Sequence, residues 1–313
     1  MTNKQVEKIC MIIPYFGSWP EWFPLYLYSC STLDNIDFYF FSDCGTPNTT
    51  YKNTVFINIG FVDYCNMVTD KLKVEFHPEK PYKLTDLKPF LGTVHSDIVN
   101  KYAFWGFSDI DLLYGDIENM INQKILKKYD FITTHSDRIA GHFTVIRTGS
   151  VYSTAWEKIP DWRRMLSCQK HYGIDERWLT YAVLPAKKWL DRGVKYLMPW
   201  IKPRTETFYR AYDFMQGFMR IIYPKILFKE QFTTVVPAKE QIWIYDAHRR
   251  TILDAKTGKT IPYLHFLFFK KTPYLETENY WKSGFYKISK GHTFSKNDRF
   301  DISLEGIVPS NQS

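Results

Sequence analysis

Short apolar runs that stop on a polar residue or a glycine recur in the first third of this chain, and they constrain its fold more than any other feature. Four runs have the length of a strand: "KICMIIPYFG" from Lys8, "IDFYFFSD" from Ile36, "NTVFINIG" from Asn53 and "KYAFWGFSD" from Lys101. Segments with helical character lie between them, at residues 20–33 and 61–74. This alternation predicts βαβ units and an α/β fold with a mostly parallel sheet covered by helices on both faces.

Polar and aromatic residues follow several of these predicted strands at the point where each strand ends. The carboxyl ends of parallel strands share one edge of the sheet, where ligands bind. We therefore expect one cleft to collect the residues that stand at these ends. They are Pro14, Tyr15, Phe16, Asp43, Ser108, Asp109 and Asp111.

The stretch "FWGFSDIDLLYGDI", residues 104–117, places three carboxylates in otherwise apolar surroundings. Asp109 and Asp111 are two residues apart, so at a strand end both can turn toward one hard cation and leave positions open for water or phosphate oxygens. Asp is also common in turns, so the pair alone is a weak signal. Asp116 is expected to be a turn or helix-cap residue.

About 20 residues upstream, "KPYKLTDLKPFLG" carries Lys80, Lys83, Asp86 and Lys88. Lysines beside a metal-binding carboxylate pair suit the charge of a diphosphate leaving group, and a solvated helix face is the alternative. The net charge of +8 also favours anionic partners. The basic residues are dispersed without a nucleic-acid-binding motif, so no nucleic-acid partner is expected. The aromatic content of 18% is consistent with a site for a sugar or base, or with composition bias.

Five cysteines without a CxxC spacing argue against a disulfide framework and a structural zinc site, and they predict a reduced, cytoplasmic protein. The sequence has no secretory signal and no apolar run of about 18 residues. Residues 199–236 mix aromatic and basic residues, which fits either a packed helical lid or contact with anionic lipid at the inner face of the cytoplasmic membrane. We expect a single domain, 1–313, with a peripheral tail at about 276–313.

The order of "PYFG", "FSD", "YKLTDLKP" and "WGFSDIDLLYGDI" resembles the GT-A class of nucleotide-sugar glycosyltransferases. It is most similar to bacterial capsule and O-antigen polysaccharide transferases with a "YK..D.KP" and "WG..D.D...G" pattern. The resemblance covers roughly residues 8–270, and its specific block runs from Tyr82 to Asp116. It implies a Rossmann-like GT-A fold with a C-terminal helical, aromatic elaboration, a nucleotide-sugar-binding half at about 8–135 and an acceptor-binding half at about 136–275.

The resemblance also assigns roles to residues. Asp109 and Asp111 become metal ligands, and Asp109 also serves the donor. In glycogenin-like members, a glycine segment lies beneath the donor sugar and a C-terminal His followed by Lys completes the metal and phosphate sites. "DRIAGHFTVIRTGS" and "IPYLHFLFFKK" supply these residues here. The implied donor-binding set is Pro14, Tyr15, Phe16, Asp43, Lys83, Asp86, Lys88, Ser108, Asp109, Gly141, His142, Lys270 and Lys271.

His265 is the implied third metal ligand, and an imidazole favours Mn²⁺ over Mg²⁺. The alternative for His142 and His265 is a buried structural histidine. Asp175 and Glu176 precede a helical run, where acids are common as N-cap or first-turn residues. The resembled class uses an acid pair there, so they are the candidate catalytic residues.

The sequence therefore predicts a metal-dependent hexosyltransferase. We expect its donor to be a nucleotide diphosphate sugar, a UDP-sugar, and its acceptor to be a glycan or lipid-linked glycan in surface polysaccharide synthesis. The His265 and Lys270 pattern favours retention of configuration, an inference from analogy. Two alternatives remain. One is a phosphohydrolase of the haloacid dehalogenase type, although Leu113 replaces the Thr or Val expected after its DxD. The other is a sugar-binding protein without enzymatic activity.

Overall fold

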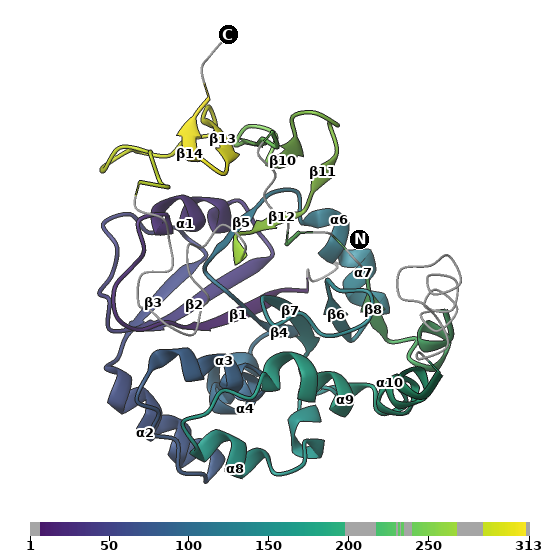
Figure 1. Cartoon of the computed structure of the whole chain (residues 1–313). Helices are drawn as coiled ribbons and strands as arrows, with labels where there is room; N and C mark the ends of the chain where they lie inside the picture. The colour runs from purple at the N-terminus through teal and green to yellow at the C-terminus, as the bar shows by residue number, and fades with distance from the viewer. Residues whose placement is uncertain are drawn as a thin grey trace, which may run out of the picture.

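The computed structural model describes residues 7–197, 217–229, 231, 233–234, 240–267 and 284–310. Its centre is a seven-stranded sheet in the order β3-β2-β1-β4-β7-β6-β8 (Figure 1). All its strands run parallel except β7, which is antiparallel to both of its neighbours. The strands are β1 (Ile9–Pro14), β2 (Ile36–Ser42), β3 (Thr54–Asn58), β4 (Phe104–Ser108), β6 (Phe131–Thr133), β7 (Phe143–Arg147) and β8 (Ile226–Phe228).

The predicted α/β fold with a mostly parallel sheet flanked by helices is confirmed. All four strands expected in the first third of the chain are present, and the helices expected at 20–33 and 61–74 are α1 (Phe23–Ser31) and α2 (Phe61–Leu72). The other helices in this part are short: α3 (Leu84–Leu87), α4 (Leu91–Val94), α5 (Ser96–Val99), α6 (Glu118–Ile121) and α7 (Gln123–Lys128). Later helices are α8 (Trp162–Ser167), α9 (Leu179–Val183) and α10 (Pro185–Leu197).

The two faces of the sheet bury different helices because side chains alternate along each strand. Cys10 and Ile12 of β1 belong to a core shared with α2, α4, α8 and α9, whereas Ile9, Met11 and Ile13 pack toward α1, α6 and α7. Figure 1 shows α2, α3, α4 and α8 together on one side of the sheet and α1 on the other. The sheet is therefore covered on both faces, as its apolar runs predict.

A second sheet of five antiparallel strands lies beyond α1, in the order β11-β10-β9-β13-β14 (Figure 1). Its buried residues pack against Leu25 and Tyr28 of α1, so α1 is buried between two sheets. Its strands are β9 (Trp243–Asp246), β10 (Thr251–Asp254), β11 (Thr260–Ile261), β13 (Arg299–Ser303) and β14 (Gly306–Pro309).

This sheet bears on two expectations about the C-terminal region. Within the part expected to be a peripheral tail, 276–313, β13 pairs with β9 and buries Phe300 and Ile302. The predicted helical elaboration is wrong for the described residues 240–267 and 284–310, whose regular structure is mainly β. Short antiparallel strands of this kind have a weaker sequence pattern than a buried parallel strand.

The region expected to be a lid or a membrane contact, residues 199–236, lies largely outside the described residues. A helix at 217–222 is described, in which Met219 is buried and Phe218, Ile221 and Ile222 are exposed. None of the helices among the described residues combines the length and the apolar character needed to span a membrane. All five cysteines are free, as expected.

One buried histidine between α4 and α5 makes the fold sensitive to acid. The His95 Nε2 lies 2.9 Å from the Tyr64 hydroxyl, and its ring packs 4.0 Å from that of Phe41 between centroids. Burial lowers the pKa of His95 from 6.5 to about 3, and Lys71 lowers it further while Asp97 opposes the shift. In the folded protein the imidazole is therefore neutral at ordinary pH.

We expect the free energy of unfolding to fall by roughly 2 kcal/mol between pH 7 and pH 5 through His95 alone. The unfolded chain takes up this proton near pH 6.5, whereas the folded chain takes it up only near pH 3. The stabilisation is thus complete above pH 6.5 and is lost as the pH falls toward 3. Urea unfolding of His95→Gln should show a flatter pH dependence, and exposed His77→Gln serves as the control. Equal pH dependence in wild type and His95→Gln would contradict this.

Candidate functional site

The two acids of the DxD sequence follow β4 directly, at the carboxyl end of this central strand. The backbone N–H of Asp109 donates to the carbonyl of His142 at 3.1 Å, which extends the pairing of β4 with β7 by one residue. The Asp109 side chain is 32% exposed, whereas that of Asp111 is 7% exposed. One acid therefore faces the open edge of the sheet and the other lies beneath it.

His265 reaches these acids through a short strand pair. After Asp111 the chain enters β5 (Leu112–Tyr114), which pairs antiparallel with β12 (Tyr263–His265) and places His265 opposite Leu112. The N–H of Phe266 donates to the Asp111 carbonyl at 3.0 Å, so the two segments stay paired up to the site. The His265 Nε2 lies 3.7 Å from the Asp111 Oδ1.

The other ring nitrogen of His265 is held by a threonine. The Thr234 hydroxyl lies 2.6 Å from the His265 Nδ1, and a backbone bridge also pairs Thr234 with His265. In the tautomer whose Nδ1–H donates to Thr234, the Nε2 keeps its lone pair on the side of Asp111. Such a hydrogen bond is the usual support of a metal-binding histidine.

Asp109, Asp111 and His265 form a group that fits a divalent cation. One ligand atom from each lies within 4.8 Å of the other two. Ligands of such an ion stand roughly 2.1 Å from it, so opposite ligands are about 4.2 Å apart and only a small inward movement is needed. Two carboxylates and an imidazole suit Mn²⁺, and an octahedral ion would keep three positions for water or phosphate oxygens.

Lys88 brings a buried positive charge to the same place. Its Nζ lies 2.5 Å from the Asp109 Oδ1, donates to the Gly141 carbonyl at 3.0 Å and lies 3.5 Å from the Asp175 Oδ2. Burial alone would lower the pKa of Lys88, but Asp109 and Asp175 outweigh it and raise the pKa. The side chain is therefore a permanent ammonium.

Asp175 and Glu176, the predicted catalytic pair, lie in one turn of π-helix at Ile174–Trp178, just before α9. The Gly141 N–H points toward the Glu176 Oε1 at 3.4 Å. A Cβ at position 141 would stand 2.4 Å from the Asp175 Oδ2, so only glycine allows this approach. Single turns of π-helix are frequent at functional sites.

The Asp175 carboxyl is buried close to other acids. Burial raises its pKa to about 7, with Lys88 opposing the shift and Glu176 and Asp109 adding to it. A carboxyl that changes its protonation near neutral pH can accept or deliver a proton in a reaction. Both acids also lie in the first turn of this helix, the place of an ordinary first-turn acid, although no side-chain cap bond is formed at its start.

His142 is buried beneath the metal group. Its ring stacks on that of His265 at 4.2 Å between centroids, and its Nε2 lies 2.8 Å from the Tyr263 hydroxyl. Tyr263 in turn donates to the Thr134 hydroxyl at 2.7 Å. Burial lowers the pKa of His142 well below its usual range, so the ring is neutral. This geometry supports the alternative of a buried structural histidine, in which the neutral His142 ring packs against His265.

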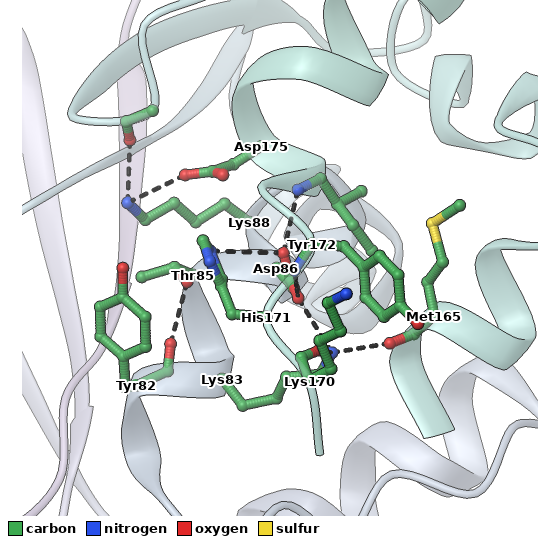
Figure 2. A network of polar contacts seen from close by, with 12 residues as sticks. Tyr82, Lys83, Thr85, Asp86, Lys88, Met165, Lys170, His171, Tyr172 and Asp175 are labelled. Atoms are coloured by element: carbon green, nitrogen blue, oxygen red, sulfur yellow. Dashed lines mark hydrogen bonds and ion pairs between the residues drawn. The ribbon is translucent and has the colours of Figure 1, made fainter. Parts of the chain in front are cut away.

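Lys83 and Asp86 form a second polar network, on the side of Lys88 where Asp175 lies (Figure 2). The Lys83 Nζ bonds the Asp86 Oδ2 at 2.9 Å and the carbonyls of Met165 at 2.6 Å and Lys170 at 2.5 Å. These three acceptors use all three N–H groups of the ammonium. The predicted donor contact of Lys83 is therefore not supported by its geometry.

The hydrogen bonds of the Asp86 carboxylate are likewise made to groups of the protein itself. Its carboxylate accepts the backbone N–H groups of Tyr172 and Ile174, each at 2.9 Å, and it is fully buried. Asp86, His171 and Asp175 could in principle hold a metal. However, Asp86 already neutralises Lys83, and Asp175 faces Lys88 (Figure 2). We therefore assign Asp86 to the support of the loop that carries Asp175, not to donor binding.

The predicted nucleoside-binding residues lie at the ends of β1 and β2. The Tyr15 ring stacks on Trp19, and the Asp43 Oδ1 accepts the N–H of Gly17 at 2.8 Å. Phe16 is buried among the rings of Phe61 and Tyr64, so its aromatic surface belongs to the core.

The remaining predicted residues have mixed positions. Pro14 is the last residue of β1 and is half-buried, and Ser108 ends β4 and is buried. Asp116 lies between β5 and α6, one residue before Ile117, which is the N-cap of α6. Lys270 and Lys271 lie outside the described residues.

Sequence reasoning missed Thr234, Tyr263 and Thr134. Each has an ordinary strand or loop composition around it. Thr234 contacts His265 and Tyr263 contacts His142 from distant parts of the chain, and Thr134 accepts the hydrogen bond of the Tyr263 hydroxyl. The one available signal was the expectation that a metal-binding histidine carries a hydrogen-bond acceptor on its other nitrogen.

No curated protein sequence matches the chain. A family described as "Family of unknown function (DUF6625)" matches residues 11–292, which include the predicted metal ligands, Lys88 and the Asp175–Glu176 pair. The match covers most of the chain, and the chain therefore belongs to this family of unknown function.

Proposed function

We propose that the chain is a metal-dependent glycosyltransferase of the GT-A class that transfers a hexose from a nucleotide diphosphate sugar, a UDP-sugar, to a glycan or lipid-linked glycan acceptor. The observation that carries the proposal is the meeting of Asp109, Asp111 and His265, residues far apart in the sequence, at the carboxyl end of β4. Ligands bind at this edge of open α/β sheets. The basic net charge of +8 also suits an anionic donor.

The cation would be held by Asp109, Asp111 and His265. Thr234 supports this site by its hydrogen bond to the His265 Nδ1. When bound, a divalent ion stabilises negative charge on a departing diphosphate. Lys88 places a fixed ammonium beside Asp109, where it adds a further positive charge at the same edge. Tyr15 and Asp43, at the neighbouring strand ends, lie on the side where a nucleoside would extend.

Asp175 and Glu176 would face the reacting sugar from the other side of Lys88. Gly141 has no side chain and lets these acids come close to the strand that follows it. Asp175 has a pKa of about 7 and can therefore exchange a proton with an acceptor hydroxyl near neutral pH. The third metal ligand from the C-terminal part favours a retaining reaction by its resemblance to glycogenin-like members.

The test is a panel of nucleotides and nucleotide sugars, each with and without Mn²⁺, followed by thermal unfolding and by analysis of released UDP. A ligand that binds only the folded protein raises its melting temperature by mass action. We expect a nucleotide diphosphate to raise it only when Mn²⁺ is present, and the matching sugar donor to release UDP when a glycan acceptor is added.

The alternatives give different results in the same panel. No metal-dependent shift with any nucleotide diphosphate would overturn the proposal. Release of phosphate from simple monoesters would favour the phosphohydrolase, and a shift with free sugars without turnover would favour a sugar-binding protein.

A further inference from the structure

The surroundings of the Lys88 ammonium are those of a bound cation. The group is buried and is enclosed by oxygen atoms of three residues, the carboxylates of Asp109 and Asp175 and the carbonyl of Gly141. Carboxylate and carbonyl oxygens are the ligands that hard divalent cations prefer. Glu176 adds a third acid next to this shell through the Gly141 N–H.

Asp109 belongs to two groups at once. Its Oδ1 lies 2.5 Å from the Lys88 Nζ, and its carboxylate also joins Asp111 and His265 in the metal group. A carboxylate that contacts two cations in this way is typical of sites with two metal ions, which stand about 3.5–4 Å apart. Here one of the two cations is part of the protein.

We propose that Lys88 is the built-in second cation of this site, so that the chain binds one divalent ion where its carboxylates could otherwise hold two. The inference rests on the metal group of the proposed function, but it needs neither a nucleotide nor a sugar. A tethered ammonium cannot be lost by dilution or chelation, so the charge beside Asp109 and Asp175 stays fixed while the single metal ion exchanges.

The experiment counts Mn²⁺ ions bound to the chelator-treated full chain, by calorimetry and by the electron paramagnetic resonance signal of free Mn²⁺. Wild type should bind one ion. Lys88→Met removes the ammonium but leaves the oxygen shell, so it should bind a second ion. Lys88→Arg keeps a positive charge and should still bind one. Lys88→Met combined with Asp175→Asn loses part of the oxygen shell and should return to one.

Lys88→Met leaves buried acids without their counter-ion and should be less stable without metal. Mn²⁺ should then raise its melting temperature by more than that of wild type, because two ions bind the folded state. If Lys88→Met aggregates, Lys88→Gln replaces it in the same comparison. Variants that stay unfolded in millimolar Mn²⁺ would overturn the proposal, because the ion should substitute for the ammonium.

An unchanged ion count in folded Lys88→Met would overturn the proposal as well. The proposed metal centre and the proposed role of Lys88 are contradicted by different results. A wild-type chain that binds no Mn²⁺ contradicts the proposed metal centre, whereas the inference on Lys88 concerns the ion gained by Lys88→Met relative to wild type. Asp111→Asn, which alters the first site alone, identifies which ion is which.

Discussion

Asp111→Asn is expected to remove the Mn²⁺-dependent rise in melting temperature and to lower the rate of sugar transfer by about a thousandfold. The substitution keeps the size of the side chain and removes its charge. A bound divalent ion contributes several kcal/mol to stabilising a leaving diphosphate, and about 4 kcal/mol corresponds to three factors of ten in rate. The backbone carbonyl of Asp111, which accepts the Phe266 N–H, is unaffected. The fold should therefore persist.

The matched control is Asp116→Asn. Asp116 is the third acid of the same stretch, but it lies beyond β5 and does not belong to the group of possible metal ligands. This variant should keep both the Mn²⁺-dependent shift and the transfer rate. UDP release by Asp111→Asn at the wild-type rate, or in the absence of metal, would contradict the proposed role of the DxD acids.

Four strands of the central sheet could be predicted from the sequence because they are mainly apolar runs. The runs at Ile9, Ile36, Thr54 and Phe104 are bounded by glycine, proline or polar residues, and each is a strand. The second sheet could not be predicted in the same way. Its strands are two to five residues long, and β13 pairs with β9 from far along the chain. Such pairing depends on tertiary packing and not on a local pattern.

The candidate site likewise contains residues that the sequence could identify and residues that it could not. The DxD acids stand out because carboxylates directly after an apolar strand are conspicuous, and the structure brings His265 to them. The lysines upstream could not be separated by sequence alone. Lys83 and Lys88 have similar neighbours in the chain, yet Lys88 contacts Asp109. The three N–H groups of Lys83 all donate to Asp86 and to two backbone carbonyls. Only the path of the loop at 165–174 distinguishes them.

The different surroundings of Lys83 and Lys88 lead to the second prediction, which concerns the free energy of unfolding. We expect Asp86→Ala to lower the free energy of unfolding by about 3–5 kcal/mol, because it leaves the Lys83 ammonium buried without its counter-ion. It also leaves the N–H groups of Tyr172 and Ile174 without their acceptor. Urea unfolding at pH 7 measures the change.

A surface ion pair provides the control for this prediction. Lys8 pairs with Asp37 at 3.2 Å, but its side chain is 51% exposed, so Lys8→Met should cost less than about 1 kcal/mol. Equal losses in Asp86→Ala and Lys8→Met would contradict the structural role of Asp86. Because Asp86 anchors the loop directly before Asp175, Asp86→Ala should also weaken the contact between Asp175 and Lys88. A conservative Lys83→Arg does not test the same point, since a guanidinium cannot reproduce the three compact bonds of the ammonium.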